Sequence, residues 1–468
     1  MYKNKKVLVA GGTGTIGIPL IKRLVELKTN VTVVSTDSVE YAKAVLGDNV
    51  SFRQMDLTNF DNCLRATKNQ DYVFNLVGIK GSTGIGETKT ASYFVPMLRF
   101  QTNLMEASFR NDISRYLFVS SVCAYPQLSL PKEEDCLWNG LPKQNDRIPG
   151  LAKRIGEVQG EAYLQEHGWD AVRIVRPSNV YGPFDDFDPA TAQVIPALIR
   201  RMIDGENPIK VWGDGSAVRD FIFSEELADW ILVALEKAPP CVPINLGSGK
   251  GVTIKELAET IAQCVPEPPQ IEWDTTKPSG DPVRILSMER AKKLMGFKLK
   301  TDLKEGIKKT VDWYLDNEKL ANQKKGYILT SKERQFLLPL AELIDRLTIG
   351  QIKEVLIPED KKSYAQEMQK LAHDIDLMIE EGELKLSARL IRIIIALSQM
   401  NLHIWYNKNK MQNDQDHYLE LLKFAHQLNG IRNQMKNLLL EETGDKEKSA
   451  IRTNFNTDDL EGWDISIE

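Results

Sequence analysis

Three glycines near the start of the chain have the spacing of a backbone turn that binds phosphate groups. Gly11, Gly14 and Gly17 follow the apolar run Val7–Ala10, and a helical pattern begins at the third glycine. The first glycine allows a tight bend, the second lets the backbone approach a pyrophosphate, and the third lets helix and strand pack closely. The helix N-terminus then offers unpaired N–H groups to the phosphates. We therefore predict a dinucleotide-binding turn rather than a purely structural one.

The residue after the second strand decides which dinucleotide can bind. An NAD site usually presents an acid there to the ribose 2′-hydroxyl, whereas an NADP site presents a cation to the 2′-phosphate. Counting from Gly17 places Ser35 at this position, with Asp37 two residues later and no arginine beside them. The sequence therefore predicts NAD or NADP without separating the two. The other residues expected to contact the cofactor are Thr15, Ile16, Asp56, Leu57, Leu76, Val77 and Gly78.

Such a turn needs a parallel sheet behind it, and the chain has the corresponding pattern. Up to about residue 223, short β-branched runs alternate with helical stretches, which is typical of a parallel sheet covered on both faces. The fold class predicted is α/β: a Rossmann-type doubly wound parallel sheet with a small mixed α/β lobe, followed by an all-α helical bundle. The expected strands are Val7–Ala10, Val31–Val34, Tyr72–Val77, Tyr116–Val119 and Ala171–Val175, and the expected helices 17–28, 94–110, 151–167, 253–264, 288–295 and 303–316.

Beyond this part, the pattern becomes helical with few breaks. We divide the chain into the sheet unit 1–320 (small lobe mainly 180–210 and 240–316), a linker 321–330, a helical domain 331–441 and an acidic, mobile tail 442–468. Two long helices in the helical domain are expected to pair antiparallel, because apolar residues recur at spacings of three and four. These residues are Leu386, Leu390, Ile393, Leu397, Met400 and Ile404, then Leu421, Phe424, Leu428, Ile431, Met435 and Leu438.

Polar side chains also follow these two helices. We interpret them as a solvated face beside the helix contact, in preference to a site for a phosphate, a sugar or a partner. They are Asn401, Trp405, Lys408, Asn429, Arg432, Asn433 and Lys436.

Composition excludes several classes of function. The formal net charge of −5 provides no basic excess for binding nucleic acid. No signal peptide is recognisable, and no apolar stretch reaches the length of a membrane span. The five cysteines and five histidines lack metal-ligand spacing, so we expect no metal site, and free thiols suit a cytoplasmic protein.

Several motifs occur in a fixed order along the first two-thirds of the chain: Ser120–Pro126, Arg176–Pro183, Val194–Arg201, Val211–Gly215, Arg219–Phe221 and Lys277–Asp281. With these motifs the sequence resembles, over about residues 5–317, the extended short-chain dehydrogenase/reductases that act on nucleotide sugars, and among them the GDP-L-fucose synthases. The resemblance implies a nucleotide-diphosphate sugar substrate, with a GDP-sugar favoured, in glycan or polysaccharide precursor synthesis. It also implies a homo-oligomer, at least a dimer. It places Pro177 at the cofactor, and in the substrate pocket Asn179, Val194, Arg201, Trp212, Arg219 and Lys277.

The same resemblance implies a catalytic group. In the family a lysine lowers the pKa of a tyrosine four residues before it, so that the phenol can exchange a proton with the sugar, and a serine polarises the same oxygen. Ser121 and Lys153 match, but Pro149 stands at the tyrosine position. Cys123 matches a cysteine that moves protons beside a ketone, but Phe184 stands at the position of its histidine partner.

Two hypotheses follow. The chain could be an altered enzyme, in which Ser121, Lys153 and Cys123 act while water or Tyr125 relays the proton. Alternatively, it is a catalytically impaired relative that binds cofactor or nucleotide sugar and presents its C-terminal helices to a protein partner. In either case Lys153 is expected to hydrogen-bond the nicotinamide ribose.

Overall fold

Seven parallel strands form the sheet that carries the glycine turn. A computed structural model describes residues 1–79, 90–128, 131–277, 281–323, 336, 338–380 and 387–443. The strand order is β11-β6-β5-β4-β1-β2-β3: the chain adds strands first on one side of β1 and then on the other, as expected of a doubly wound sheet. Its strands are β1 (Lys6–Ala10), β2 (Asn30–Ser35), β3 (Ser51–Gln54), β4 (Tyr72–Asn75), β5 (Arg115–Val119), β6 (Val172–Pro177) and β11 (Pro243–Leu246).

Helices cover both faces of this sheet, as the side chains of β1 show. Val7 and Val9 belong to one apolar core with Leu24 of α1, whereas Leu8 belongs to a second core with Leu104 of α5. Successive strand residues point to opposite faces, so the sheet is doubly wound, which confirms the predicted fold class. The helices are α1 (Gly17–Glu26), α2 (Val39–Leu46), α3 (Phe60–Thr67), α5 (Thr90–Arg110), α6 (Arg147–His167) and α8 (Ser224–Lys237).

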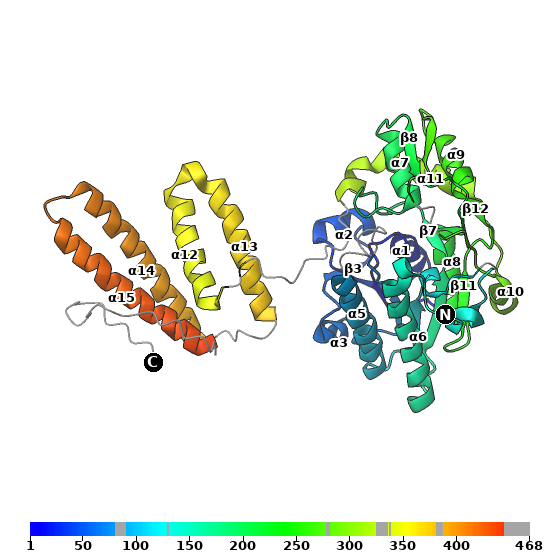
Figure 1. Cartoon of the computed structure of the whole chain (residues 1–468). Helices are drawn as coiled ribbons and strands as arrows, with labels where there is room; N and C mark the ends of the chain where they lie inside the picture. Colours follow the sequence, from blue (N-terminus) through cyan, green and yellow to red (C-terminus); the bar gives the residue numbers. More distant parts are fainter. Residues whose placement is uncertain are drawn as a thin grey trace. The chain divides into compact units, whose positions relative to one another are not determined.

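A smaller lobe with its own apolar core lies above the sheet in Figure 1. Its elements are α7 (Val194–Ile203), β8 (Ile209–Trp212), α9 (Ile254–Ala262), β13 (Ile271–Asp274) and α11 (Leu303–Gln323). Short strands and one helix join it to the sheet: β7 (Asn179–Tyr181), β9 (Val218–Arg219), β10 (Phe221–Phe223), β12 (Val252–Thr253), β14 (Val283–Arg284) and α10 (Glu289–Met295). The helix expected over 303–316 continues to Gln323 through a kink at Asn317. Residues 321–323, expected in the linker, are therefore helical.

The contacts divide the chain into two compact units, Met1–Leu329 and Thr330–Glu468. In the second unit, α12 (Leu340–Leu356) pairs with α13 (Lys361–Glu380), and α14 (Ala388–Asn413) pairs with α15 (Tyr418–Thr443) (Figure 1). Leu343, Leu397 and Leu428 meet in its apolar core. The predicted antiparallel helix pair is thus present as α14 and α15. Residues 442 and 443, expected in the tail, end α15, and 444–468 lie outside the described residues.

Part of the polar set on these two helices is buried, so its interpretation as a solvated face is wrong there. The Asn401 amide donates a hydrogen bond of 2.9 Å to Oδ1 of Asp345 on α12, and Arg432 Nε donates one of 3.0 Å to the same oxygen. The Lys436 ammonium forms an ion pair with Glu342. Asn401 and Lys436 are only 6% and 7% exposed. These polar residues therefore hold the helices together from inside.

Within the described ranges, no helix combines the length and the apolar character needed to cross a membrane. The same residues contain no cluster of three or more His, Cys, Asp or Glu side chains arranged to hold a metal ion.

Candidate active site

The glycine turn lies directly beneath the carboxyl end of β4. Gly11 has φ +77°, and an added Cβ would stand 3.2 Å from the backbone of Leu76 and Val77. A Cβ on Gly17 would stand 2.5 Å from the backbone of Gly12, so helix and turn pack too closely for any side chain. In contrast, a Cβ on Gly14 would meet only the Gly11 carbonyl oxygen, at 3.4 Å. The turn is thus closed toward the protein and open at Gly14, as a backbone that receives a pyrophosphate requires.

A carboxylate is fixed beside this turn at the end of β2. Thr13 Oγ1 donates a hydrogen bond of 2.5 Å to Oδ2 of Asp37, and the Ser35 hydroxyl donates one of 3.0 Å to the same oxygen. Asp37, which follows the expected acid position by two residues, is therefore folded back onto the glycine turn. The two hydroxyls orient its charge where the ribose of a dinucleotide lies in this fold.

Lys153 is held between the ends of two neighbouring strands. Its ammonium donates to the carbonyl oxygen of Val119, at the end of β5, at 2.8 Å and to that of Val77, just beyond β4, at 3.2 Å. The side chain is buried, and this burial lowers its pKa to about 8. Two of the three ammonium donors are satisfied by backbone within the described part of the chain, which leaves one for a ligand.

Ser121 and Cys123 follow β5 in one short turn that faces the start of α6. The Cys123 amide donates to the Ser121 hydroxyl at 3.1 Å. Burial, with the charge of Asp146 as the next cause, raises the pKa of the Cys123 thiol to about 11. At neutral pH this thiol therefore keeps its proton. Pro149 lies in the first turn of α6, where a missing N–H costs nothing, one turn before Lys153.

Charged side chains from several segments form a connected group, and two of them, Asp146 and Arg284, act on the Cys123 thiol. Asp146 forms an ion pair with Arg284 of β14, and Arg284 also pairs with Asp281 at 2.5 Å. The Lys143 ammonium lies 2.7 Å from Asp281, and the Arg219 guanidinium donates to the Asp281 carbonyl oxygen at 2.5 Å. Asp146 and Lys143 are not among the site residues expected from the sequence. For Asp146 the sequence offers one signal, an acid directly before a helical stretch, which is typical of a helix N-cap.

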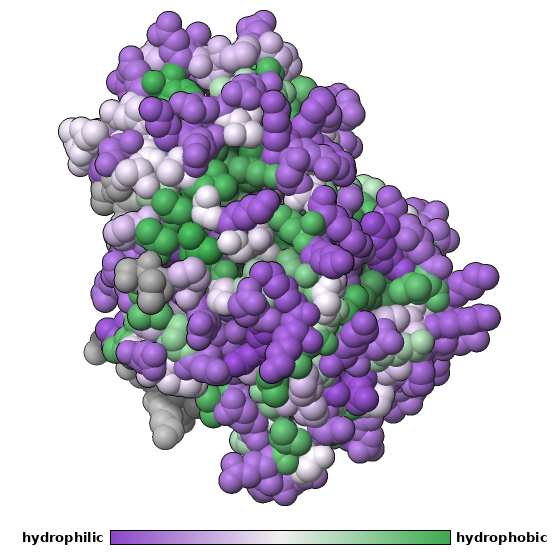
Figure 2. All heavy atoms as spheres, turned by 90° about the vertical axis from the view of Figure 1, so that its right-hand side faces the viewer, coloured by the Kyte–Doolittle hydropathy of each residue, from purple (hydrophilic) through white to green (hydrophobic). Residues whose placement is uncertain are grey.

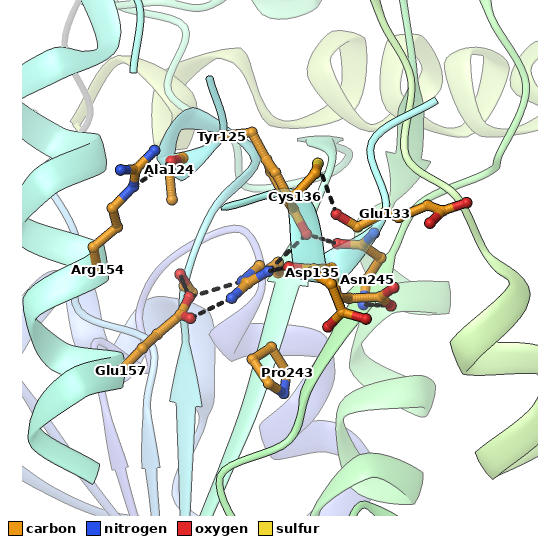
Figure 3. A network of polar contacts seen from close by, with 12 residues as sticks. Ala124, Tyr125, Glu133, Asp135, Cys136, Arg154, Glu157, Pro243 and Asn245 are labelled. Atoms are coloured by element: carbon orange, nitrogen blue, oxygen red, sulfur yellow. Dashed lines mark hydrogen bonds and ion pairs between the residues drawn. The ribbon is translucent and has the colours of Figure 1, made fainter. Parts of the chain in front are cut away.

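Tyr125 has a different environment from the one proposed for a proton relay. Its hydroxyl donates to Asn245 Oδ1 at 2.6 Å and accepts from the Arg176 guanidinium at 2.9 Å. Arg176 in turn pairs with Glu157, and both are buried. Figure 3 shows Tyr125, Glu157 and Asn245 of this network. Burial raises the pKa of Tyr125. The hydroxyl is committed to a structural network, so we assign no proton relay to it.

The residues expected to bind substrate fall into separate places. Arg219 belongs to the charged group that includes Asp281 and Arg284. Asn179 Nδ2 donates to the Asp220 carbonyl oxygen at 2.8 Å, and Arg201 of α7 pairs with Glu206. Val194, Trp212 and Lys277 lie elsewhere on the small lobe. Val194 begins α7. The Lys277 ammonium lies 5.8 Å from the centre of the exposed Trp212 ring.

Phe184 occupies the other altered position. Its ring lies 4.6 Å from that of Trp313 on α11. Its carbonyl oxygen accepts a hydrogen bond of 3.4 Å from Thr15 of the glycine turn, and the Asp185 carboxylate accepts one of 3.0 Å from the same hydroxyl. The loop after β7 is thus attached to the glycine turn.

The remaining positions expected at the cofactor lie at or just after the carboxyl ends of strands. Asp56 and Leu57 follow β3, the first exposed and the second buried, Gly78 follows β4, and Pro177 is the last residue of β6.

The face of the molecule in Figure 2 shows how polarity is distributed below the uppermost lobe. Hydrophobic atoms gather in a band there, with hydrophilic side chains above and below it.

A parallel sheet with an open glycine turn after β1 and a buried lysine at its carboxyl edge defines an extended short-chain dehydrogenase/reductase. Residues 7–247 match the NAD dependent epimerase/dehydratase family, and the chain belongs to that family. This confirms the resemblance found in the sequence. The helical second unit lies outside the matched residues.

The relatives and solved structures agree with this assignment. The chain is 32% identical over 320 residues to GDP-L-fucose synthase 1 of Arabidopsis thaliana, covering 67% of this chain and 94% of that protein. It is 28% identical over 257 residues to GDP-L-colitose synthase of Yersinia pseudotuberculosis, covering 53% and 82%. UDP-N-acetylglucosamine 4-epimerase from Methanobrevibacter ruminantium M1 superposes with a TM-score of 0.60 at 26% identity, covering 67% of this chain and 99% of that structure.

Proposed function

We propose that the first unit is an NAD-dependent oxidoreductase or epimerase acting on a nucleotide-diphosphate sugar, with a GDP-sugar favoured, in glycan or polysaccharide precursor synthesis. The observation that carries the proposal is the Lys153 ammonium, fixed by the carbonyls of Val77 and Val119 at the sheet edge that the glycine turn also reaches. Relatives named for GDP-L-fucose and GDP-L-colitose support the nucleotide. We further propose a homo-oligomer, at least a dimer, in the cytoplasm, where the five free thiols stay reduced.

We favour NAD over NADP because of Asp37. Its carboxylate can accept hydrogen bonds from ribose hydroxyls, but it would repel a 2′-phosphate. Isothermal titration should therefore give tighter binding of NAD than of NADP. Asp37→Ser should reduce this preference by about tenfold or more, since a charge-assisted hydrogen bond is lost. Asp48→Ser, which removes an exposed carboxylate elsewhere, should leave the preference unchanged. Tighter binding of NADP by the unaltered chain would refute the choice.

The residues present divide the chemistry as follows. When bound, the nicotinamide supplies a hydride donor or acceptor for a sugar carbon. Lys153 would orient the ribose, and Ser121 would polarise the reacting sugar oxygen. Because Pro149 has no ionisable group, the proton on that oxygen must move through water. Burial raises the pKa of Cys123 to about 11, so at neutral pH the thiol is only a weak proton donor, and almost no thiolate is present to act as a base.

The second candidate is a catalytically impaired relative that binds cofactor or nucleotide sugar and acts through its C-terminal helices. Pro149 and Phe184 favour it, because both positions lack a group that can move a proton. Pro149→Tyr separates the candidates. A rise in turnover with GDP-sugars would show that only the phenol is missing, whereas an unchanged, inactive protein that still binds the nucleotide would favour the binding role.

The first test is mass spectrometry of small molecules released from the denatured protein. Stoichiometric NAD or a nucleotide sugar would support a working pocket. An empty protein that also fails to bind added NAD would reject the proposal. If turnover is found, a Ser121→Ala, Lys153→Ala double variant should lose it, and retained turnover would overturn the assignment of these two residues.

A further inference from the structure

Helix α14 has apolar side chains on two opposite sides. Its inner side contributes Ile393, Leu397, Met400 and Ile404 to the core of the second unit. Its outer side also carries large apolar residues, at successive spacings of four, seven and four, which place them in one line along the helix. Their exposed fractions are 47% for Ile391, 52% for Ile395, 36% for Leu402 and 49% for Tyr406. A single exposed apolar residue is ordinary, but a continuous line of four indicates a binding surface.

The charges of α14 restrict what can cover this line, here called the outer apolar line. The helix contains four arginines and lysines but no aspartate or glutamate: Arg392, Lys408, Lys410 and Arg389, the last of which pairs with Glu442 of α15. If a second copy of α14 packed antiparallel on the first, the basic residues near one end of each helix would face those near the other end of its partner. Coulomb repulsion therefore disfavours a symmetric α14 contact, whereas an apolar segment that carries acids is favoured.

The chain contains one segment with this chemistry. Residues 457–468 include no lysine or arginine and carry Asp458, Asp459, Glu461, Asp464 and Glu468. Leu460, Trp463 and Ile467 recur at spacings of three and four, which predicts one apolar side if the segment binds as a helix. The segment is thus complementary to α14 in both charge and apolar pattern.

An ion pair shows at which end of α14 the chain leaves α15. Arg389 Nε lies 3.3 Å from Oε1 of Glu442, the residue before the last of α15. The chain therefore leaves α15 beside the end of α14 at which the outer apolar line begins. Residues 444–456 can span at most about 45 Å, while the line from Ile391 to Tyr406 is about 22 Å long. The tether is long enough to reach the whole line.

We propose that the acidic, tryptophan-containing segment 457–468 docks on the outer apolar line of α14 in the same chain. Trp463 and its apolar neighbours cover Ile391, Ile395, Leu402 and Tyr406, and the flanking carboxylates face the basic residues of the helix. The second unit thus carries a peptide-binding face that its own chain occupies.

Photo-crosslinking in the full chain tests this. With p-benzoylphenylalanine in place of Trp463, irradiation followed by proteolysis and mass spectrometry should give crosslinks mainly within 388–413, at the mass of one chain. Ile395→Ser combined with Leu402→Ser should reduce them about tenfold, because two apolar contacts are lost. Val355→Ser combined with Leu419→Ser, at positions 69% and 78% exposed on other helices, is the matched control and should leave them unchanged.

Three results would overturn the proposal: crosslinks outside α14, equal loss in both double variants, or crosslinks at the mass of two chains. Circular dichroism of each variant checks that the helices remain. Lys408→Glu combined with Lys410→Glu supplies an independent arm, since reversing the charge should also reduce crosslinking, and an unchanged yield would contradict the electrostatic part.

Discussion

Gly150 of α6 stands directly against the carbonyl oxygen of Cys123: a Cβ added to Gly150 would lie 2.3 Å from that oxygen and 3.0 Å from Cγ of Pro142. No side chain fits there. The contact sets the distance between the helix that carries Pro149 and Lys153 and the turn that carries Cys123. The site therefore depends on a residue that itself takes part in no chemistry.

Gly150→Ala should push α6 away from this turn. We expect a loss of about 1–3 kcal/mol in the free energy of unfolding, typical of overpacking, together with weaker NAD binding as Lys153 shifts. Urea denaturation and isothermal titration measure the two effects. Gly78→Ala is the control for stability, because a Cβ there meets nothing within 4 Å. Equal stabilities of the Gly150 variant and the unaltered protein would show that the contact relaxes freely.

Burial of Lys153 predicts a particular dependence of stability on pH. Its pKa is lowered from 10.5 to about 8, so between these values the unfolded chain holds a proton that the folded chain has released. The unfolded state then binds more protons, and the contribution of Lys153 to the free energy of unfolding rises with pH across this window. The rise is at most about 3 kcal/mol.

The measurement compares the unaltered protein with Lys153→Met by urea denaturation from pH 7.5 to 9.5, without cofactor. Other titrating groups affect both proteins alike, so the difference isolates the lysine. The unaltered protein should gain stability relative to the variant as pH increases. A flat difference would mean that the folded lysine retains its ordinary pKa.

The sequence predicted the parts of the site that depend on local spacing. The glycine turn, the strands that end beside it and the position of Lys153 on a helix all follow from patterns within about 30 residues, because strand, turn and helix are adjacent in the chain. Helix α11 shows the limit even here. Its polar residues beyond Asp316 are typical of a linker, yet the helix continues to Gln323.

The hydrogen-bond partners of several residues could not be predicted, because they come from segments far apart in the chain. Tyr125 belongs to the same motif as Ser121, but its hydroxyl partners are Arg176 and Asn245, which lie 51 and 120 residues away along the chain. The sequence likewise predicts a solvated Arg432. In the structure it bonds to Asp345, a partner 87 residues earlier that no local pattern reveals. A polar residue at helical spacing indicates neither burial nor partner until the helices are packed.

The ion pair between Arg176 and Glu157 should be a large contributor to the stability of the first unit. Both side chains are at most 3% exposed, and Glu157 also accepts a hydrogen bond of 2.5 Å from Ser120. Arg176→Met leaves this carboxylate buried without its cation, which should cost about 3–5 kcal/mol. In the double variant Arg176→Met, Glu157→Gln, part of the stability should return, since no buried charge remains. Chemical denaturation followed by fluorescence measures both, and an additive loss in the double variant would contradict the argument.

The buried Asp345 predicts a stability effect confined to the second unit. Its carboxylate accepts from Asn401 and Arg432, and the Lys436 ammonium lies 3.7 Å away. Asp345→Ala would leave two cations near one another with half their countercharge, at an expected cost of about 3–5 kcal/mol. Because the chain divides into two compact units, the loss should lower the unfolding midpoint of the helical unit and leave that of the sheet unit in place.

Hydrogen exchange resolved by peptide, at increasing urea, separates the two midpoints. Glu359→Ala, which removes an exposed acid of the same unit, should move neither. If Asp345→Ala lowered both midpoints equally, the two units would have to unfold as one, and the cluster would stabilise more than the three helices α12, α14 and α15 that it joins.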